Sequence, residues 1–392
     1  MSDELDIDAV RADVHALAAM TRDSAGPGER AAAEWAAQRL LEAGATGVVT
    51  EPYRARATNS WSFAGHSAAG LLAQLIGGVR GAALALAALT SLERDVSGRA
   101  PWRRRSVGGA RGANAVGSIV AAVQTRRTVV LVAHLDAART GVAWHPAVTA
   151  FGSARRLRTR RADPVMGLQG IGLAASAAGA LAGRLPGARR LRRVGAALNL
   201  AAIALNLDIA RSPTVPGAND NATGVAVALD LARQLAAAPL DHTDVLIALV
   251  GSEESGMGGF DALVRAREAD LDPARSFVLG LDTLGCGTPI LAASEGALAT
   301  HHYAAADLDL VDAGARRAGQ QPPQRWRIAA WTDPLLALTR RIPAASLLSI
   351  GPGHYPHYHH PSDLPEHVDW DSVAACARIA EGTLREFDAR QG

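Results

Sequence analysis

Short, almost wholly apolar segments recur along this chain, and they constrain its fold more than any other feature. Runs of this kind are typical of strands that are covered on both faces. Stretches with helical periodicity separate several of them, at 223–238, 258–268 and 371–389. Strands that alternate with helices indicate an α/β fold in which helices flank a central, mostly parallel or mixed sheet. The predicted strands are 118–123, 128–134, 244–252, 276–282, 289–294 and 345–351.

The N-terminal segment 8–43 predicts two helices separated by a Gly- and Pro-containing turn, and Gly44 is expected to end the second helix before a further strand. The first helix is acidic and amphipathic and lacks the basic start and apolar run of a secretion signal. We therefore expect a cytoplasmic protein, or at least one that is not exported by way of a signal peptide.

Composition agrees with one large globular domain that spans 1–392, because 48% of the residues are hydrophobic and 20% are charged. The net charge of +2 is too small to indicate a nucleic-acid-binding protein. The two cysteines, Cys286 and Cys376, form neither a Cys-x-x-Cys metal pair nor a disulfide framework.

Two apolar, Ala- and Gly-rich insertions, 61–95 and 140–212, interrupt the alternation of strands and helices. Their apolar runs, which in the second insertion lie within 165–210, are about as long as a short membrane span or a buried helix. Polar residues interrupt the runs, and arginine clusters give no clear orientation by the positive-inside rule. Two interpretations stay open: helical hairpins that form a cap over the sheet domain, or four apolar helices in or against a membrane. In the second case the arginines of 103–105, 155–161 and 189–193 would meet anionic lipid.

Carboxylates and imidazoles follow four of the predicted strands. In an open α/β sheet the carboxyl ends of the strands form the binding edge, so these side chains should converge there. A group of carboxylates and imidazoles without thiolates favours divalent metals of the zinc type. Each residue alone has a plainer interpretation, a solvated surface side chain. The residues are His134 and Asp136, the pair Glu253 and Glu254, Asp282, and the histidines of GPGHYPHYHHPSD at 351–363.

Asp220 lies in the segment PGANDNATGVA, just before a predicted helix. Asp and Asn at such a position commonly cap the helix by accepting its first N–H groups. The alternative is that the Asp220 carboxylate is a metal ligand, since two oxygens allow one carboxylate to bridge two ions.

The ordered series AHLD, GANDNATGVA, GSEESGMGG, LGLDTLG and YHHPSD resembles the co-catalytic zinc aminopeptidase family, metallopeptidase family 28. That family also contains glutamate carboxypeptidase-like and glutaminyl cyclase-like members. The resemblance implies a zinc-exopeptidase fold and two Zn²⁺ ions, for which Co²⁺ or Mn²⁺ could substitute. It implies the following roles: one metal held by His134 and Asp282, the other by Glu254 and His359, both bridged by Asp220, with Glu253 as general base, Asp136 orienting His134, and Tyr358 and His360 contacting substrate.

The implied activity is hydrolysis of peptide bonds, most simply by an aminopeptidase that acts on short peptides. Three alternatives stay open: a zinc acyltransferase of the glutaminyl cyclase type, a metal-free binding module on the same fold, and a membrane-embedded peptidase with four apolar helices. The first and third of these keep a metal site, whereas the second would not need one.

This chain departs from the family pattern at three positions near the motifs, with Ala137 for Ser, Gly280 for Asn and His360 for Thr. None of these changes removes a ligand, so they bear on substrate fit more than on metal binding. The larger departure is the insertion between Asp136 and Asp220. Because it begins and ends beside predicted ligands, we expect it to lie at the mouth of the site and to restrict access to small substrates.

Overall fold

A single mixed sheet of nine strands organises the computed structural model, which describes residues 5–99, 109–162, 167–183 and 185–390. The strand order is β1-β2-β4-β3-β5-β9-β6-β7, and β8 pairs with β6. The strands are β1 (Thr46–Ala55), β2 (Ala110–Ile119), β3 (Arg127–His134), β4 (Thr243–Val250), β5 (Ser276–Leu281), β6 (Thr288–Glu295), β7 (His301–His302), β8 (Gln324–Arg327) and β9 (Ala344–Ile350).

The four central strands, β4, β3, β5 and β9, are neighbours and run parallel. The pairing places His134 opposite Val250, so β3 and β4 end at the same level of the sheet. Parallel neighbours bring their carboxyl ends to one edge. The predicted α/β class is therefore confirmed, with a parallel centre and antiparallel pairs toward both sides.

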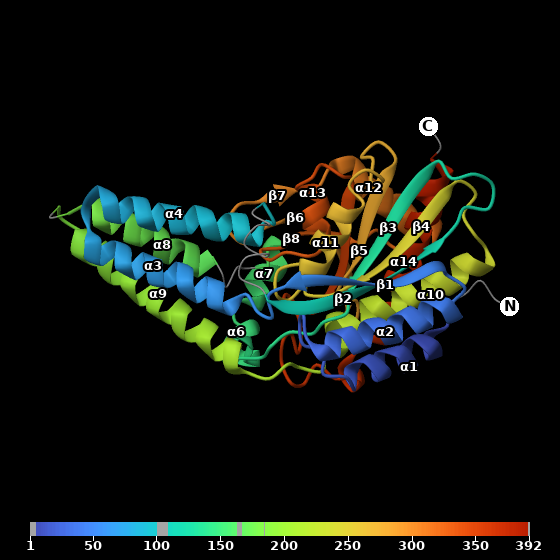
Figure 1. Ribbon diagram of the computed structural model, residues 1–392, viewed down its shortest axis with the longest axis horizontal. Coiled ribbons are helices and arrows are strands. Elements are labelled where there is room, and N and C mark those ends of the chain that lie inside the picture. Colours follow the sequence, from blue (N-terminus) through green and yellow to red (C-terminus); the bar gives the residue numbers. More distant parts are fainter. Residues whose placement is uncertain (1–4, 100–108, 163–166, 184, 391–392) are drawn as a thin grey trace.

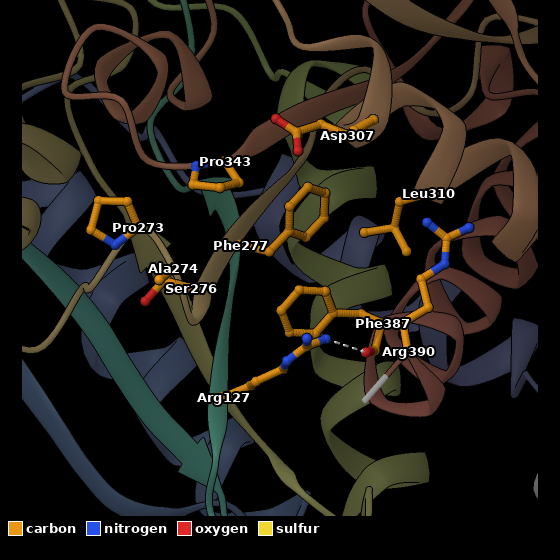
Figure 2. Close-up of a pocket in the computed structure, with 11 residues that line it drawn as sticks. Arg127, Pro273, Ala274, Ser276, Phe277, Asp307, Leu310, Pro343, Phe387 and Arg390 are labelled. Carbon is orange, nitrogen blue, oxygen red and sulfur yellow. Dashed lines mark hydrogen bonds between the residues drawn. The ribbon is translucent and has the colours of Figure 1, made fainter. Parts of the chain in front are cut away.

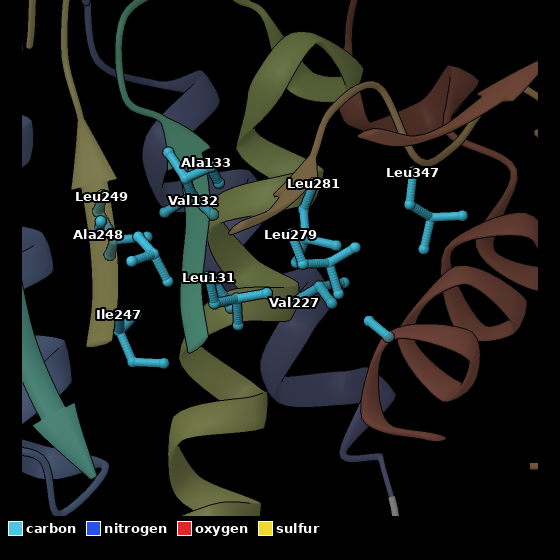
Figure 3. Close-up of a cluster of buried hydrophobic side chains, with 14 of the residues drawn as sticks. Leu131, Val132, Ala133, Val227, Ile247, Ala248, Leu249, Leu279, Leu281 and Leu347 are labelled. Carbon is cyan, nitrogen blue, oxygen red and sulfur yellow. The ribbon is translucent and has the colours of Figure 1, made fainter. Parts of the chain in front are cut away.

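Helices cover the sheet on both faces, and β5 shows how its residues divide between them. Leu279 and Leu281 point the same way and lie beside Val227 of helix α10 (Figure 3). Successive side chains of a strand point to opposite faces, and Gly280 between them lies against Pro334 of helix α13. The helices of this domain are α1 (Ile7–Ala18), α2 (Pro27–Glu42), α10 (Thr223–Ala237), α11 (Gly258–Ala266), α12 (Ala305–Arg317), α13 (Pro334–Leu338) and α14 (Trp370–Ala389).

The sequence-based boundaries are right for most central strands and wrong at one place. The strand predicted at 118–123 is β2, which ends at Ile119, so most of the predicted run lies in a loop. In that loop the N–H group of Ala121 donates to the side-chain carboxylate of Asp244 and the N–H group of Ala122 to the carbonyl of Leu240, so neither continues the main-chain pairing with β4. The two N-terminal helices are present, and Gly44, at φ +90°, follows the end of α2.

The two apolar insertions pair into one four-helix bundle, which we call the helical lobe. Helices α3 and α4 come from the first insertion, and α8 and α9 from the second. Each hairpin packs against the other through α3 with α9 and α4 with α8. The lobe projects lengthwise away from the sheet domain (Figure 1). Its helices are α3 (Ser60–Ile76), α4 (Gly78–Val96), α8 (Gly167–Leu181) and α9 (Ala188–Arg211).

Two of the three predicted arginine clusters, 155–161 and 189–193, lie in the described part of the chain, in the lobe or just before it. The cluster 103–105 lies outside the described residues. Short helices α6 (Pro146–Thr149) and α7 (Ser153–Thr159) precede α8, and Arg156 of α7 donates a hydrogen bond to the carbonyl of Gly353. The 155–161 cluster therefore begins beside the segment that follows β9.

Gly280 gives the first testable prediction, because the family pattern has Asn there and this chain has no room for it. A Cβ at Gly280 would lie 2.4 Å from Cγ of Pro334, a rigid ring that cannot move aside. We expect Gly280→Ala to lower the free energy of unfolding by about 1–3 kcal/mol through overpacking. Thermal unfolding measures this. The matched control is Gly65→Ala, at a helical position with nothing within 4 Å, and equal melting temperatures for the two variants would refute the account.

Candidate metal centre

The carboxyl edge of the parallel strands brings together all seven residues predicted to bind metal or assist catalysis. His134 ends β3, Asp136 follows it, and Asp282 directly follows β5. Glu253 and Glu254 lie in the turn after β4, and His359 lies in the segment after β9. Asp220 reaches the same place from the turn before α10.

The Asp220 carboxylate lies between the two histidines and gives one oxygen to each. Its Oδ1 atom is 3.2 Å from Nε2 of His134, and its Oδ2 atom is 3.2 Å from Nε2 of His359. Each histidine also faces a second carboxylate, since Asp282 lies 4.0 Å from His134 Nε2 and Glu254 lies 3.2 Å from His359 Nε2. The arrangement is two half-sites that share one carboxylate.

The turn around Asp220 explains why its carboxylate is free to face the histidines. Asn221, not Asp220, accepts hydrogen bonds from the N–H groups of Gly224 and Thr283. The N–H groups of Asn219 and Asp220 themselves donate to the carboxylate of Asp363. The capping interpretation thus describes Asn221, and the Asp220 side chain caps nothing among the described residues.

Asp136 connects His134 to the turn that carries the glutamates. The nearest partner of His134 Nδ1 is the main-chain oxygen of Asp136 at 3.0 Å, with the Asp136 carboxylate at 3.5 Å. The carboxylate itself accepts hydrogen bonds from the N–H groups of Glu253 and Glu254 and from the hydroxyl of Ser24. A partner at Nδ1 leaves Nε2 as the atom available to a metal.

Sequence reasoning missed two buried charged residues, Arg22 in the turn between α1 and α2 and Glu29 in the first turn of α2. Arg22 donates three hydrogen bonds to the carbonyls of Leu135, Pro216 and Gly217, so it joins the end of β3 to the turn of Asp220. Burial lowers the pKa of Arg22 to about 10. Glu29 accepts hydrogen bonds from the N–H and hydroxyl of Ser252 and from the Tyr53 hydroxyl. The available signal was the run RDSAGPGER, a charged turn between apolar helices.

The charges of the site favour cations. Burial raises the pKa of Glu253 well above its usual value, and the nearby Glu254 and Asp333 add to the rise while His134 opposes it. Burial also raises the pKa of Asp282 to about 6, with His134 opposing and Asp220 contributing. Crowded buried carboxylates are costly unless they are paired or bind metal.

The unsatisfied atoms of the site also fit a metal ion. Oε1 of Glu254 and Nε2 of His359 are buried and have no hydrogen-bond partner among the described residues, although carboxylate oxygens lie close to that nitrogen. Ligand atoms of His134, Asp220 and Glu254 lie within 4.8 Å of one another. Imidazole nitrogens and carboxylate oxygens without thiolates are ligands that suit zinc.

A cavity of about 340 Å³ adjoins this centre and extends to the helical lobe. Glu253, Glu254, Tyr358 and His359 line one end. The predicted substrate contact His360 is not among the described lining residues, and its ring bonds to Ser362 instead. Apolar side chains of α9 and of the preceding segment form much of the remaining wall: Trp144, Val148, Leu198, Ala201, Ala202, Leu205 and Ile209.

A second cavity, of about 230 Å³, lies among residues at the amino ends of β3 and β5 (Figure 2). One of its two arginines, Arg127, lies over the ring of Phe387 and donates to the Phe387 carbonyl. The lining contains no group of metal-type ligands among the described residues. We therefore assign the chemistry to the carboxyl edge.

Comparison with known proteins agrees with this geometry. The sequence model of Peptidase family M28 matches residues 206–384, which include Asp220, both glutamates, Asp282 and His359. Over these residues the chain matches peptidase family M28. It is accordingly a metal-dependent peptidase. His134 and Asp136 lie before the matched range, and the sheet brings them to it.

Solved structures share the fold of this chain. LapB from Legionella pneumophila is 12% identical, with a TM-score of 0.57 over 98% of this chain and 72% of that one. The zinc aminopeptidase BSAP from Bacillus subtilis is 13% identical, with a TM-score of 0.58 over 98% and 96%. A glutaminyl cyclase from Bacteroides thetaiotaomicron is 14% identical, with a TM-score of 0.56 over 97% and 98%. No curated protein matches the sequence.

Arg22 gives the second prediction, because three buried carbonyls depend on its guanidinium. We expect Arg22→Met to lower the free energy of unfolding by at least about 3 kcal/mol, since hydrogen bonds to charged groups are worth more than neutral ones. Arg22→Lys, which keeps the charge but has a different donor geometry, should fall between. Chemical denaturation of both against Arg111→Met, an exposed site, measures the effect. An Arg22→Met protein as stable as the Arg111→Met control would contradict the role.

Proposed function

We propose that this M28 peptidase is a di-zinc aminopeptidase that removes apolar amino-terminal residues from short peptides. The observation that carries the proposal is the Asp220 carboxylate, with one oxygen directed to each of two histidines. A carboxylate in this position is suited to bridge two ions, and paired hydrolytic metals are usually separated by about 3.5–4 Å.

In this proposal His134 and Asp282 hold one ion, and Glu254 and His359 hold the other. Bound zinc would supply the Lewis acidity that polarises a scissile carbonyl and makes water a stronger acid. Cobalt or manganese could replace zinc in such a ligand set. Asp136 and Arg22 hold the surrounding main chain, so the ligands are positioned before any ion binds.

Glu253 is the residue best suited to move the proton. It lies beside the ligand Glu254, lines the cavity and is buried. The described side chains donate no hydrogen bond to its carboxylate, and its pKa is raised by burial. A raised pKa suits a base that takes a proton from water and returns it to the leaving amine.

The cavity supports the preference for apolar residues and short substrates. Leu198, Ala202 and Leu205 of α9 face the space beside the glutamates. The wall belongs to the insertion between Asp136 and Asp220, which was expected to restrict access. A cavity of about 340 Å³ lies at the lower end of the usual range for small-ligand pockets, so an apolar side chain and a short peptide fit it better than a folded protein.

A glutaminyl cyclase is among the proteins of similar fold. The alternative reaction is therefore cyclisation of an N-terminal glutamine. In that reaction the α-amine of an N-terminal glutamine attacks its own side-chain amide, and ammonia leaves. An aminopeptidase instead consumes water and releases a free amino acid. A peptide with N-terminal glutamine distinguishes the two by product, because one yields ammonia and a blocked peptide and the other yields glutamine.

Glu253 provides the third prediction. Glu253→Gln should lower kcat by about 10²–10⁴-fold, the usual contribution of a general base, while bound zinc measured by elemental analysis stays unchanged. Glu254→Gln is the matched control and should lose zinc as well as activity. Loss of metal from Glu253→Gln and retention by Glu254→Gln would mean that the two roles are reversed, and zinc-free active protein would refute the proposed function.

The α9 wall provides the fourth prediction. Ala202→Trp should fill the cavity and reduce kcat/KM at least about tenfold for leucyl and phenylalanyl peptides, with a smaller effect on alanyl peptides, because the lost pocket space discriminates by size. Ala204→Trp, exposed on the same helix and not among the cavity residues, is the control. Equal losses on small and large residues, or equal effects of the two variants, would contradict an apolar subsite formed by α9.

A further inference from the structure

The interior of the helical lobe consists largely of small residues. In its outer half the buried cluster is Ala73, Ala85 and Ala177, each from a different helix. Glycines lie at the closest approaches, as where a Cβ at Gly195 would lie 2.9 Å from the main chain of Ser176. Buried Leu and Phe side chains are few, and the largest of them lie in a separate cluster that also contacts the sheet domain: Phe63, Leu92 and Leu173.

Large aliphatic side chains of the lobe point outward instead. Leu75 of α3 is 84% exposed, Leu86 of α4 is 49% exposed, Ile171 of α8 is 55% exposed and Leu200 of α9 is 56% exposed. A four-helix bundle in water buries such side chains and exposes charged ones. In this bundle, large aliphatic side chains are instead exposed on all four helices.

Polar side chains in the interior join the helices. Asn199 of α9 donates hydrogen bonds to the hydroxyl of Ser176 and the carbonyl of Gly172, both on α8. Gln169 of α8 donates to the carbonyl of Phe63 and the hydroxyl of Ser67, both on α3. Small residues at close helix contacts, with hydrogen bonds between helices, are typical of bundles that associate in lipid.

Charged residues flank the lobe at its two ends and are absent between them. Helices α3 and α8 contain no Asp, Glu or Arg, and neither do 81–92 of α4 and 194–207 of α9. The uncharged part of α9 spans about 21 Å at the helical rise, somewhat less than the hydrocarbon thickness of about 30 Å. Arginines at the outer end can extend toward headgroups and make up the difference. They are Arg80, Arg189, Arg190, Arg192 and Arg193.

Helix α9 is also the one described helix that is long and apolar enough to cross a membrane by itself, and α8 is apolar but shorter. Core helices of soluble proteins can have the same length and composition. In this case, however, only 17% of the apolar window of α9 is buried inside the protein. The helix is therefore not shielded as a core helix would be.

We propose that the helical lobe is inserted in the hydrocarbon of a lipid bilayer, with the arginines of its outer end in the headgroup layer of the opposite leaflet. A protein partner would cover one face of the lobe, whereas the exposed aliphatic side chains lie on all four helices. Lipid covers every side and requires no complementary shape. The sheet domain, most of whose large aliphatic side chains are buried, stays in water beside the bilayer.

Nitroxide labels on the full chain, reconstituted in vesicles of phosphatidylcholine and phosphatidylglycerol, test the proposal. Cys286 is first replaced by Ser and Cys376 by Ala, and thermal unfolding confirms that this background is folded. Labels at Leu75→Cys, Leu86→Cys, Ile171→Cys and Leu200→Cys should be more accessible to oxygen than to a water-soluble nickel chelate. Leu41→Cys, on α2 of the sheet domain and 54% exposed, is the control and should show the reverse.

Membrane extraction completes the test. The wild-type chain should remain with vesicles after washes with high salt and with alkaline carbonate, since arginine–headgroup attraction alone is released by salt. Recovery of a monodisperse protein in a detergent-free supernatant would overturn the proposal. So would lobe labels accessible to the nickel chelate, or protected only because two copies associate in solution. None of these outcomes depends on the proposed peptidase activity, which is assayed separately.

Discussion

The position of the Asp220 carboxylate between two histidines is the constraint on which the site depends. Its two oxygens can face two histidines only if the turn before α10 is held relative to the ends of β3 and β9. Arg22 fixes that turn to the residue after His134, and Asp363 fixes it to the segment that carries His359. Asn221 rather than Asp220 caps the start of α10, so the Asp220 carboxylate makes no capping hydrogen bond. The metal ligands are thus positioned by side chains that bind the main chain of the turns carrying those ligands.

The convergence of the ligands could be predicted from the sequence because it follows from strand direction. When a buried strand ends in His134, and others end before Glu253 and at Asp282, parallel pairing must bring these residues to one edge. Arg22 and Glu29 could not be found this way, since the carbonyls that Arg22 binds and the N–H and hydroxyl groups that Glu29 binds take their positions only in the folded sheet. The strand predicted at 118–123 failed for a related reason. Val120 and Val123 have the composition of a strand but are exposed, beyond the last residue that pairs with β4.

The helical lobe shows a different limit of sequence patterns. Amphipathic periodicity is the same whether the apolar stripe faces a protein core or a lipid, so the apolar runs of the insertions were compatible with a cap and with a membrane bundle. The membrane proposal rests on the packing, because it shows which side of each helix carries the large residues. In the sheet domain Val, Leu and Ile fill the interior, whereas in the outer lobe Ala and Gly fill it. The sheet domain is therefore packed as proteins are in water, with large aliphatic residues inside. The outer lobe is packed with small residues inside, which is typical of helices that associate in lipid.

Helix α9 connects the two parts of the protein physically. Leu198 and Leu205 line the cavity beside the glutamates, and Val194 and Leu200 lie exposed on the outside. In water, an exposed apolar face on the outside of α9 would lower the solubility of the protein. It would contribute nothing to the cavity, because the cavity is lined by the other face of the helix. In a bilayer both faces favour the same residues, because an apolar side chain of a substrate and a lipid chain both exclude water. One helix can thus provide both an apolar wall for the substrate and an anchor in lipid. Helix α9 can do so because it belongs to the connection between β3 and the turn of Asp220, which adjoins the metal centre at one end and extends into the lobe at the other.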